Sequence, residues 1–580
     1  MNDQTPSRRA AEPPSRDVDK RNLLIAFVLM MIVAITPSLI WPTKKPAAGR
    51  LSGSADSAVV RDSTARPAVE RQPTAQPPNR PTADSGRTVW VTSPLYRLGF
   101  STHGARLVSA ELLQYQSFAP GDSAKPVQLV PRGDAFLRHR LVLPSGDTVS
   151  LADWDFQPSP DAPGIVLSAG QGAKPLRFDA ERRGSHVTLE YRFVPDEYRF
   201  DVHGSVTGLG SGGAVLLIDL SDGLRSAEKD SLDDYRHYAV VTKASKTERT
   251  DFSGIRPDQR ALFNGPFEWV GVKSKYFFTA ALALEEGQPT FAGAIAIGGS
   301  RSGKAASRAT VSITMPVQPA GTFRYQVFAG PLDSRHLSRL GHDLDDANPY
   351  GGIFRPIIQP VSQIVLTVLL WMHGRLNLAY GWVLILFGIV VRILLWPLNQ
   401  KAMESGIRMQ AVAPLIKETQ DKYKNDPERL QREMLRIYKE HKVNPFGGCL
   451  PMLLPMPVLL ALFFVFANTI AFRGVPFLWL PDLSRPDPLK IIPILMGLSM
   501  FGLSKVGQIG VPPNPQTKMM VYFMPIFMTV LFLNFASGLN LYYAAQNLFS
   551  IPQQYLIAKR RQREAPVTAG GTRVVTPVKT

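Results

Sequence analysis

The sequence contains one cysteine, Cys449, which excludes a disulfide framework and a zinc site built on cysteines. Its nine histidines are scattered and lack the spacing of metal ligands. No Ser/His/Asp set and no pair of catalytic carboxylates stands out along the chain. We therefore predict that the protein is not an enzyme and uses neither a metal nor a cofactor.

Charge is also scarce. Only 19% of the 580 residues are charged, and the 47 acidic residues are outnumbered by 65 basic ones. The mean hydropathy of −0.03 averages a polar half, residues 42–350, and an apolar half, residues 351–558. This pattern excludes an ordinary cytosolic enzyme and a protein made only of membrane helices. Basic residues could mark nucleic acid, ribosomal RNA or a membrane surface, but they concentrate beside hydrophobic runs and therefore indicate membrane topology.

The first hydrophobic run, residues 22–43, carries no charge and has the length of a membrane helix. Trp41 marks its far interface. A cleaved secretory signal is the alternative, but the run is long and no small-residue cleavage site closes it, which favours an uncleaved anchor. The following residues, 44–87, are rich in proline, serine and alanine and are typical of a disordered linker.

Residues 88–345 favour an all-β domain. Short apolar or alternating segments such as VTLEYRF, AVLLIDL and FRYQVFAG are separated by Gly, Pro, Asp and Ser, which predicts a β-sandwich. Within it, GGSRSGKA (298–305) matches the start of a phosphate-binding loop. Ala305 replaces the hydroxyl residue that would bind Mg²⁺, and a strand-like segment follows, so we predict no nucleotide site.

The apolar half contains charge-free runs that, with the anchor, predict six spans. With the N-terminus inside, the cytoplasmic segments carry 23 Lys and Arg residues, against three in the outer loop 471–490. Residues 356–372 could be a seventh span. However, Gln359, Gln363 and Thr367 form a polar stripe at helical spacing, which favours a helix lying in the outer interface.

Arg392 is the first candidate functional residue because it lies within a span, where a charge is costly. Snorkelling to the headgroups is the alternative reading. The last span adds a polar stripe at steps of three and four, with Gln546 and Gln553 at its margin. One interpretation of such a stripe is that it forms hydrogen bonds between packed helices. Together with Arg392 in a neighbouring span, the stripe favours a second interpretation, a hydrophilic groove. The stripe residues are Asn540, Tyr543, Asn547, Ser550 and Gln554.

Residues 401–442 are strongly charged and predict a cytoplasmic helical hairpin. Asp426 and Pro427 predict the start of its second helix, since a capping acid precedes a proline at the first helical position. The charged faces of the hairpin indicate either a surface that is simply exposed to water or one that contacts a client protein or the ribosome.

The segments VRILLWPLNQKAMESGIRMQAVAPLIKE, YKEHKVNPFGGCLPMLLPMPVLLALFF and FMPIFMTVLFLNFASGLNLYYAAQNLFSIPQQ resemble the YidC-type membrane protein insertases of the YidC/Oxa/Alb superfamily. The segments WVTSPLYRLGFSTHGARLVSAEL and VFAGPLDSRHL resemble the large periplasmic domain of the Gram-negative form more weakly. The resemblance implies insertion of nascent membrane proteins, alone or with the Sec translocon, through a groove open to cytoplasm and lipid. It matches the family's groove arginine to Arg392 and its last-span tyrosine to Tyr543, while Gly388 replaces a hydroxyl residue of some members.

The expected fold is therefore multi-domain, with an α-helical polytopic membrane core and an all-β periplasmic sandwich. We expect an insertase and chaperone of the bacterial inner membrane with both termini cytoplasmic. Its expected partners are nascent membrane proteins, the Sec translocon with its SecYEG and SecDF-type subunits, the ribosome and membrane lipids, but not DNA. The expected segments are a cytoplasmic N-terminus (1–21), an anchor (22–43), a linker (44–87), the β-sandwich (88–345), an interfacial amphipathic helix (353–374), spans at 376–400, 446–470, 489–507, 517–536 and 538–558, the hairpin (401–442) and a basic tail (559–580).

Two other functions are alternatives to insertion. A secondary transporter or channel for a small solute predicts inverted repeats and broken helices in matching positions, and the sequence shows no such internal symmetry. A receptor that works through its β-domain predicts loss of function when most of residues 88–340 are deleted. An insertase should largely tolerate that deletion.

Overall fold

The computed structural model describes residues 86–209, 213–288, 290–303, 305–348, 354–400, 412, 415–416, 418–424, 426–441, 456–509 and 519–564. All of these residues belong to one compact unit, residues 79–580. The predicted N-terminus, anchor and linker up to residue 85 lie outside the described residues. So do parts of the hairpin, the start of the second core span and the chain beyond residue 564.

Alternation of side chains explains the strands. In β10 (Ser185–Phe193) every second side chain is buried, because neighbouring residues of a strand point to opposite faces of the sheet. The segments VTLEYRF, AVLLIDL and FRYQVFAG lie in β10, β12 and β22, which confirms these predicted strands.

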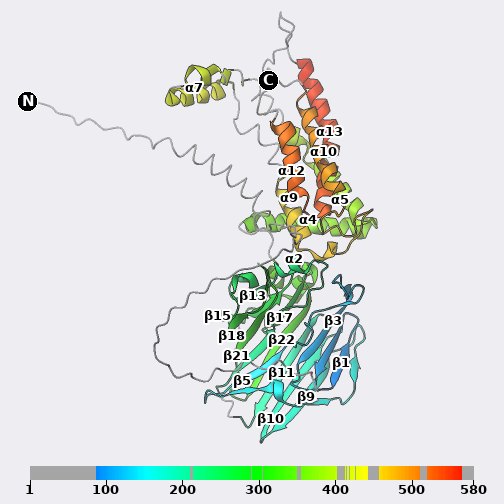
Figure 1. The fold of residues 1–580 in the computed structure, drawn as a ribbon, viewed down its shortest axis with the longest axis vertical. Coiled ribbons are helices and arrows are strands. Elements are labelled where there is room, and N and C mark those ends of the chain that lie inside the picture. The colour runs from blue at the N-terminus through cyan, green and yellow to red at the C-terminus, as the bar shows by residue number, and fades with distance from the viewer. Residues whose placement is uncertain are drawn as a thin grey trace, which may run out of the picture. The chain divides into compact units, whose positions relative to one another are not determined.

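The strands form a β-sandwich, shown in Figure 1. In the described part of the chain, the largest sheet has the order β14 (Thr247–Asp251), β13 (Ala239–Lys243), β16 (Trp269–Lys273), β17 (Phe277–Leu282), β22 (Thr322–Pro331), β11 (Arg199–Thr207), β10, β9 (Lys174–Arg182) and β7 (Gln157–Ser159). A second has the order β15 (Arg260–Phe267), β18 (Phe291–Gly298), β21 (Ala309–Pro316), β12 (Val215–Ser221), β5 (Arg138–Val142) and β6 (Thr148–Ser150). A third has the order β4 (Pro126–Gln128), β3 (Leu107–Gln116), β2 (Tyr96–Ser101), β1 (Thr88–Thr92) and β8 (Gly164–Val166).

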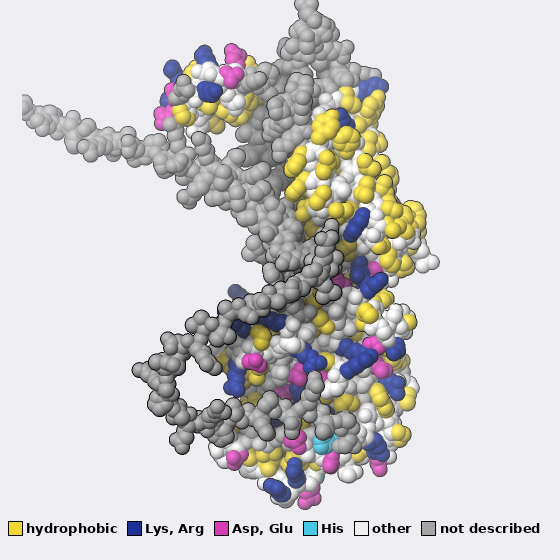
Figure 2. Space-filling view, in the orientation of Figure 1, with side chains coloured by type: hydrophobic (Ala, Val, Ile, Leu, Met, Phe, Trp, Pro, Cys, Tyr) yellow, Lys and Arg dark blue, Asp and Glu magenta, His cyan; other side chains and the backbone are white. Residues whose placement is uncertain are grey.

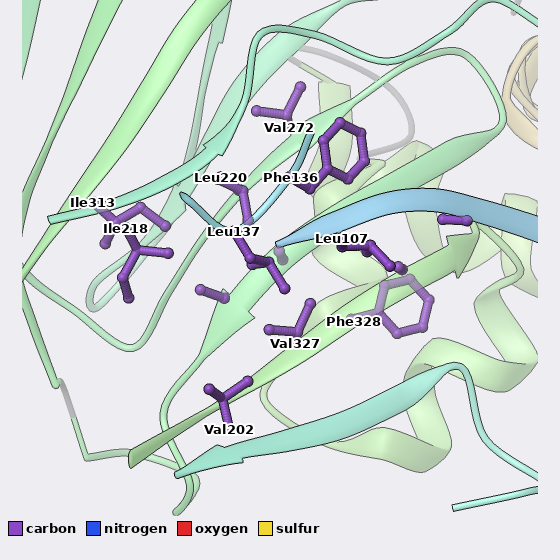
Figure 3. Packing of buried hydrophobic residues seen from close by; sticks show 14 of the residues in the cluster. Leu107, Phe136, Leu137, Val202, Ile218, Leu220, Val272, Ile313, Val327 and Phe328 are labelled. Carbon is purple, nitrogen blue, oxygen red and sulfur yellow. The ribbon is translucent and has the colours of Figure 1, made fainter. Parts of the chain in front are cut away.

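The sandwich core lies between these sheets. Figure 3 shows Ile218 and Ile313 of one sheet and Val202, Val327 and Phe328 of another within the same cluster of buried residues. Each fully buried aliphatic or aromatic side chain contributes about 1.5–3 kcal/mol relative to an exposed one. Burial on this scale explains why about 250 residues can form one domain.

An aromatic group joins the third sheet to the largest one. The rings of Phe100 in β2 and Tyr191 in β10 lie 4.6 Å apart, and the Tyr191 hydroxyl donates a 2.6 Å hydrogen bond to the Ala105 carbonyl. Because this hydroxyl is buried, its hydrogen bond removes the cost of an unpaired polar group.

The phosphate-loop motif folds as part of a hairpin. β18 ends at Gly298, and two short strands, β19 (Arg301–Ser302) and β20 (Ala305–Ala306), pair with each other before β21 begins. A phosphate-binding loop needs a helix N-terminus at this point. The structure confirms the predicted strand after the motif, where a phosphate-binding loop would continue into a helix.

The β-domain contains two short helices, α2 (Ser231–Tyr235) and α3 (Ser334–Leu340). Longer helices follow the domain. They are α4 (Arg355–Leu376), α5 (Tyr380–Leu394), α7 (Pro427–Glu440), α9 (Met456–Asn468), α10 (Ile491–Gly507), α12 (Met524–Phe532), which follows a π-helical turn, Met519–Phe523, and α13 (Ser537–Glu564). Asp426 accepts a hydrogen bond from the Arg429 amide at the start of α7, which confirms the predicted helix start. α13 continues into the predicted tail as far as Glu564.

Within the described residues, α4 alone is long and apolar enough to cross a membrane by length and composition. Shorter apolar helices occupy Tyr380–Leu394, Met456–Asn468, Ile491–Gly507 and Val521–Phe532. Figure 1 shows α4 running across the direction that α10, α12 and α13 share. The interfacial placement of α4 and the number of spans stay predictions.

The loop after α9 contacts the β-domain. Ile470 belongs to the hydrophobic core of the sandwich, and the side chain of Arg473 is only 3% exposed. The Arg473 guanidinium donates a 2.6 Å hydrogen bond to the Glu228 carboxylate and others to the carbonyls of Gln116 and Ala227. These contacts fix the α9–α10 loop to the sandwich.

Candidate functional site

Arg392 lies near the end of α5, whose fifteen residues are otherwise apolar apart from Tyr380 and Trp382 in the first turn. Its side chain points toward α13, where its Nη2 donates a 2.6 Å hydrogen bond to Oε1 of Gln553. Arg392 is half-buried, so this arrangement differs from the alternative in which the side chain extends only toward the headgroups.

The charge of Arg392 is not neutralised by a protein carboxylate. Among the described residues, no Asp or Glu lies within ion-pair distance of its guanidinium. Its Nε is buried without a hydrogen-bond partner, as is Nε2 of Gln553. A partly buried cation with a single amide acceptor is poorly satisfied, because charged groups are costly to remove from water without full pairing.

Two more orphaned polar atoms lie on α13. The Tyr542 hydroxyl and Oδ1 of Asn540 are both buried without a partner. The Tyr542 ring packs on α5, with its centroid 5.9 Å from that of Phe387. Gly388 lies beside the same ring. A Cβ atom added at Gly388 would lie 3.5 Å from the Tyr542 ring, which is an ordinary van der Waals contact. A residue with a hydroxyl side chain at this position is therefore compatible with the packing.

The polar stripe predicted for the last span faces α10 and α12. Asn540 donates to the Phe532 carbonyl at 3.0 Å, and Asn547 donates to the Ser499 hydroxyl at 3.3 Å. The Tyr543 ring stacks on Phe532 with centroids 6.1 Å apart. These hydrogen bonds join packed helices, which is the alternative interpretation of the stripe given in the sequence analysis.

The other two stripe residues make local contacts. The Ser550 hydroxyl donates a 2.6 Å hydrogen bond to the Gln546 carbonyl within α13. Gln554 packs close to Gly507 of α10, where an added Cβ would lie 2.6 Å from its Nε2. The structure therefore brings the stripe to α10 and α12, and brings a different residue, Gln553, to Arg392.

Sequence reasoning placed Gln553 only at the margin of the stripe and did not select Tyr542. The signal that could have found them is a second helical row, Tyr542, Gln546 and Gln553, spaced by four and seven residues. Such spacing places the three residues on one side of a helix. All three are buried, at 0%, 5% and 1% exposure.

The surface around this site is apolar. Figure 2 shows mostly hydrophobic side chains over the described bundle helices and a mixture of acidic and basic side chains over the β-domain. Exposed members include Ile393 of α5, Leu498 of α10, Ile526 of α12 and Leu548 of α13. This distribution matches helices that contact lipid rather than water.

No cluster of His, Cys, Asp and Glu side chains that could hold a metal ion occurs among the described residues. The polar seam between α5 and α13, defined by Arg392, Tyr542 and Gln553, also offers no nucleophile with an adjacent base. Its chemistry is that of a hydrogen-bonding and cationic surface inside an apolar bundle.

Two family models together match most of the chain. The model described as 60Kd inner membrane protein matches residues 371–564, and that of the YidC periplasmic domain matches residues 88–364.

Relatives match nearly the whole length. The membrane protein insertase YidC of Chlorobaculum tepidum is 30% identical, with coverage of 92% of this chain and 94% of the relative. That of Chloroherpeton thalassium is 27% identical, with coverage of 94% and 97%. A crystal structure of an active YidC insertase with its first transmembrane domain resolved is 18% identical, has a TM-score of 0.33, and covers 81% of this chain and 93% of that one.

Proposed function

This chain belongs to the YidC family of membrane protein insertases, and we propose that the polar seam between α5 and α13 is where it receives its clients. The protein inserts newly made membrane proteins into the inner membrane and carries a periplasmic β-domain. The comparisons name an insertase family rather than an enzyme class. The transporter alternative is therefore not favoured.

One observation carries the proposal. In the described part of the helical core, the buried side-chain polar atoms without a partner all belong to α5 and α13: Arg392 Nε, Gln553 Nε2, Tyr542 Oη and Asn540 Oδ1. Buried polar atoms are almost always hydrogen-bonded in proteins. Three of these atoms, on Arg392, Gln553 and Tyr542, lie in the seam. Water or the polar tail of a client would satisfy them, so the seam is equipped to hold polar groups at membrane depth.

The energetics favour transient use of this site. An Arg at the centre of a membrane helix costs about 2.5–3.5 kcal/mol on insertion scales. An acidic client tail that pairs with Arg392 offsets part of that cost for both groups. The apolar segment of the client then moves into lipid and gains about 25 cal/mol for each Å² that leaves water.

The membrane potential assists the same step. With the usual inside-negative sign, it pulls an acidic tail outward with about 2.3 kcal/mol per charge for each 100 mV. Arg392 would hold such a tail only until its apolar segment has left the seam. The site thus acts as a relay and needs no nucleotide of its own.

We further propose the topology predicted from charge. Both termini and the hairpin with α7 lie in the cytoplasm, six helices span the membrane, and α4 lies in the outer interface. Exposed Ile357, Ile364 and Trp371 on α4 suit an interfacial helix. The Sec translocon and the ribosome are proposed partners, and chaperone activity toward the inserted client is a proposed extension.

Site-specific photo-crosslinking tests the seam directly. A photoreactive residue at Tyr543, which follows the seam residue Tyr542 in α13, should capture a nascent membrane protein while it is being inserted. The matched control is Leu548, which lies on the same helix but is 58% exposed. Capture by lipid alone at Tyr543, or equal capture at both positions, would contradict the proposal.

Charge reversal tests the role of Arg392. Arg392→Glu should reduce insertion of a client with an acidic tail about tenfold or more, because repulsion replaces pairing. Arg392→Lys keeps the charge and should retain more activity. A client with a neutral tail is the second control. Equal insertion of the acidic client by all three proteins would remove the role assigned to Arg392.

A further inference from the structure

The β-domain contains two adjoining clefts that the insertion mechanism does not use. Their volumes are about 330 and 540 Å³, and both are lined by Arg132, Arg225 and Ser226. They share these three lining residues, and we call the two clefts together the basic cleft.

Cations outnumber carboxylates in the basic cleft. Its cationic lining residues are Arg97, Lys125, Arg132, Arg225 and Arg308, and its acidic ones are Glu111, Asp122 and Glu228. Glu228 is already neutralised by Arg473 from the α9–α10 loop. The cleft therefore keeps an excess of positive charge, which attracts an anion.

Two of these arginines have free donors. Arg308 makes no ion pair with any described residue, and the Arg132 side chain is 79% exposed with a single weak contact, 3.5 Å, to Asp122. Asp122 opposes anion binding, but it is shared by Arg225, Lys125 at 3.5 Å and Arg132. Each guanidinium can offer two parallel N–H groups to one phosphate.

The contacts of Arg473 place the basic cleft close to the membrane core. Arg473 follows α9 by five residues and touches the cleft residue Glu228 directly. In the same loop, Leu478 is 68% and Trp479 38% exposed, and a Trp beside an exposed apolar residue is typical of the interface. The headgroup layer, about 5–8 Å on each side of the hydrocarbon, therefore lies within reach of the cleft.

We propose that the basic cleft binds the phosphodiester headgroup of an acidic phospholipid from the periplasmic leaflet. The charge of the cleft selects an anion, its arginines suit phosphate, and its position beside the α9–α10 loop favours a lipid over a soluble anion. Bound lipid would hold the β-domain against the membrane independently of client insertion.

Lipid photo-labelling of the full-length chain tests this proposal. The protein is reconstituted in phosphatidylcholine vesicles that contain a minority of phosphatidylglycerol with a photoactivatable group near its phosphate. A matched labelled phosphatidylcholine reports simple proximity. Adducts are located by peptide mass spectrometry, and we expect phosphatidylglycerol adducts on residues 119–132 and 224–228 in excess over its share of the bilayer.

Charge-removing variants supply the control. R132Q/R308Q should lower the ratio of phosphatidylglycerol to phosphatidylcholine adducts about tenfold or more, since each cation near the surface attracts acidic lipid. R182Q/R183Q removes two exposed charges, one at the end of β9 and one in the turn that follows it, outside the cleft, and should leave the ratio unchanged. Client insertion is measured in parallel and should be the same for both variants, which separates this site from the α5–α13 seam.

Three results would overturn the proposal: equal labelling by both lipids, an equal effect of the two double variants, or displacement of the labelled lipid by inorganic phosphate at concentrations that leave bulk electrostatics unchanged. The last would assign the cleft to a soluble phosphate compound instead.

Discussion

Replacement of Arg473 should loosen the β-domain from the membrane core. Its Nε, Nη1 and Nη2 donate to Glu228 at 2.6 Å, to the Gln116 carbonyl at 2.8 Å and to the Ala227 carbonyl at 3.1 Å. The guanidinium also lies 4.4 Å from the centre of the Phe118 ring. Arg473→Ala removes all four contacts and leaves Glu228, with an 11% exposed side chain, without its cation.

The cost follows from the burial of this pair. Removal of one partner from a buried ion pair typically costs about 3–5 kcal/mol. In a domain of this size, 1 kcal/mol corresponds to about 2–4 °C in Tm, so a decrease of roughly 10 °C is expected. Glu228→Gln should cost less than Arg473→Ala because the amide oxygen can still accept from Arg473 Nε, and the guanidinium keeps its two carbonyl acceptors and the Phe118 ring although it loses its counter-charge.

Thermal unfolding of the reconstituted full-length chain, followed by tryptophan fluorescence, measures this decrease. Hydrogen exchange at the Phe118 amide, which donates a 2.7 Å hydrogen bond to the Ala227 carbonyl, reports undocking locally. Arg485→Ala is the matched control because Arg485 lies in the same loop and forms no ion pair among the described residues. The reasoning fails if Arg473→Ala and Glu228→Gln are additive within about 0.5 kcal/mol in the double variant.

Three further predictions follow from other residues. Gln553→Leu removes the acceptor of Arg392, worth about 1.5–3 kcal/mol for a charged hydrogen bond, and should slow insertion of an acid-tailed client, whereas Gln546→Leu should have little effect in the same assay. Burial lowers the pKa of His139 to about 4, below its ordinary value near 6.5, so the unfolded chain binds a proton more readily than the folded one between these pH values. The free energy of unfolding of the β-domain should therefore fall by about 1.4 kcal/mol per pH unit as the pH drops from 6.5 toward 4. His139→Gln should reduce this pH dependence, as measured by thermal unfolding. Asp426→Ala removes the cap of α7 and should cost about 1 kcal/mol, visible as faster hydrogen exchange in its first turn.

The sandwich could be predicted because its signals are local. Alternation in β10 and the breakers between strands identify elements without reference to partners. The order of strands could not be read in the same way. β22 pairs with both β11 and β17, which lie far apart in sequence, and such pairing is decided by packing of the whole core.

The candidate site was predictable only in part. Arg392 stands out because a charge in an apolar helix is rare, and the α13 stripe stands out through its spacing. The rotation of α13 relative to α5 is set by packing, including that of Tyr542 on Phe387. That rotation decides that Gln553, rather than the stripe, reaches Arg392. The periodicity of α13 reveals two polar rows but does not say which of them faces α5.

A comparison of two arginines in the same chain supports the functional reading of the seam. Arg473 is almost fully buried, and its structural role is served by a carboxylate, two carbonyls and an aromatic ring. Arg392, in the apolar helical core, has one amide acceptor and an orphaned Nε. Where a guanidinium serves only to join parts of the structure, as at Arg473, this fold therefore surrounds it with hydrogen-bond partners. At Arg392 it leaves donors open, as a site must when its partner arrives with the client and departs again.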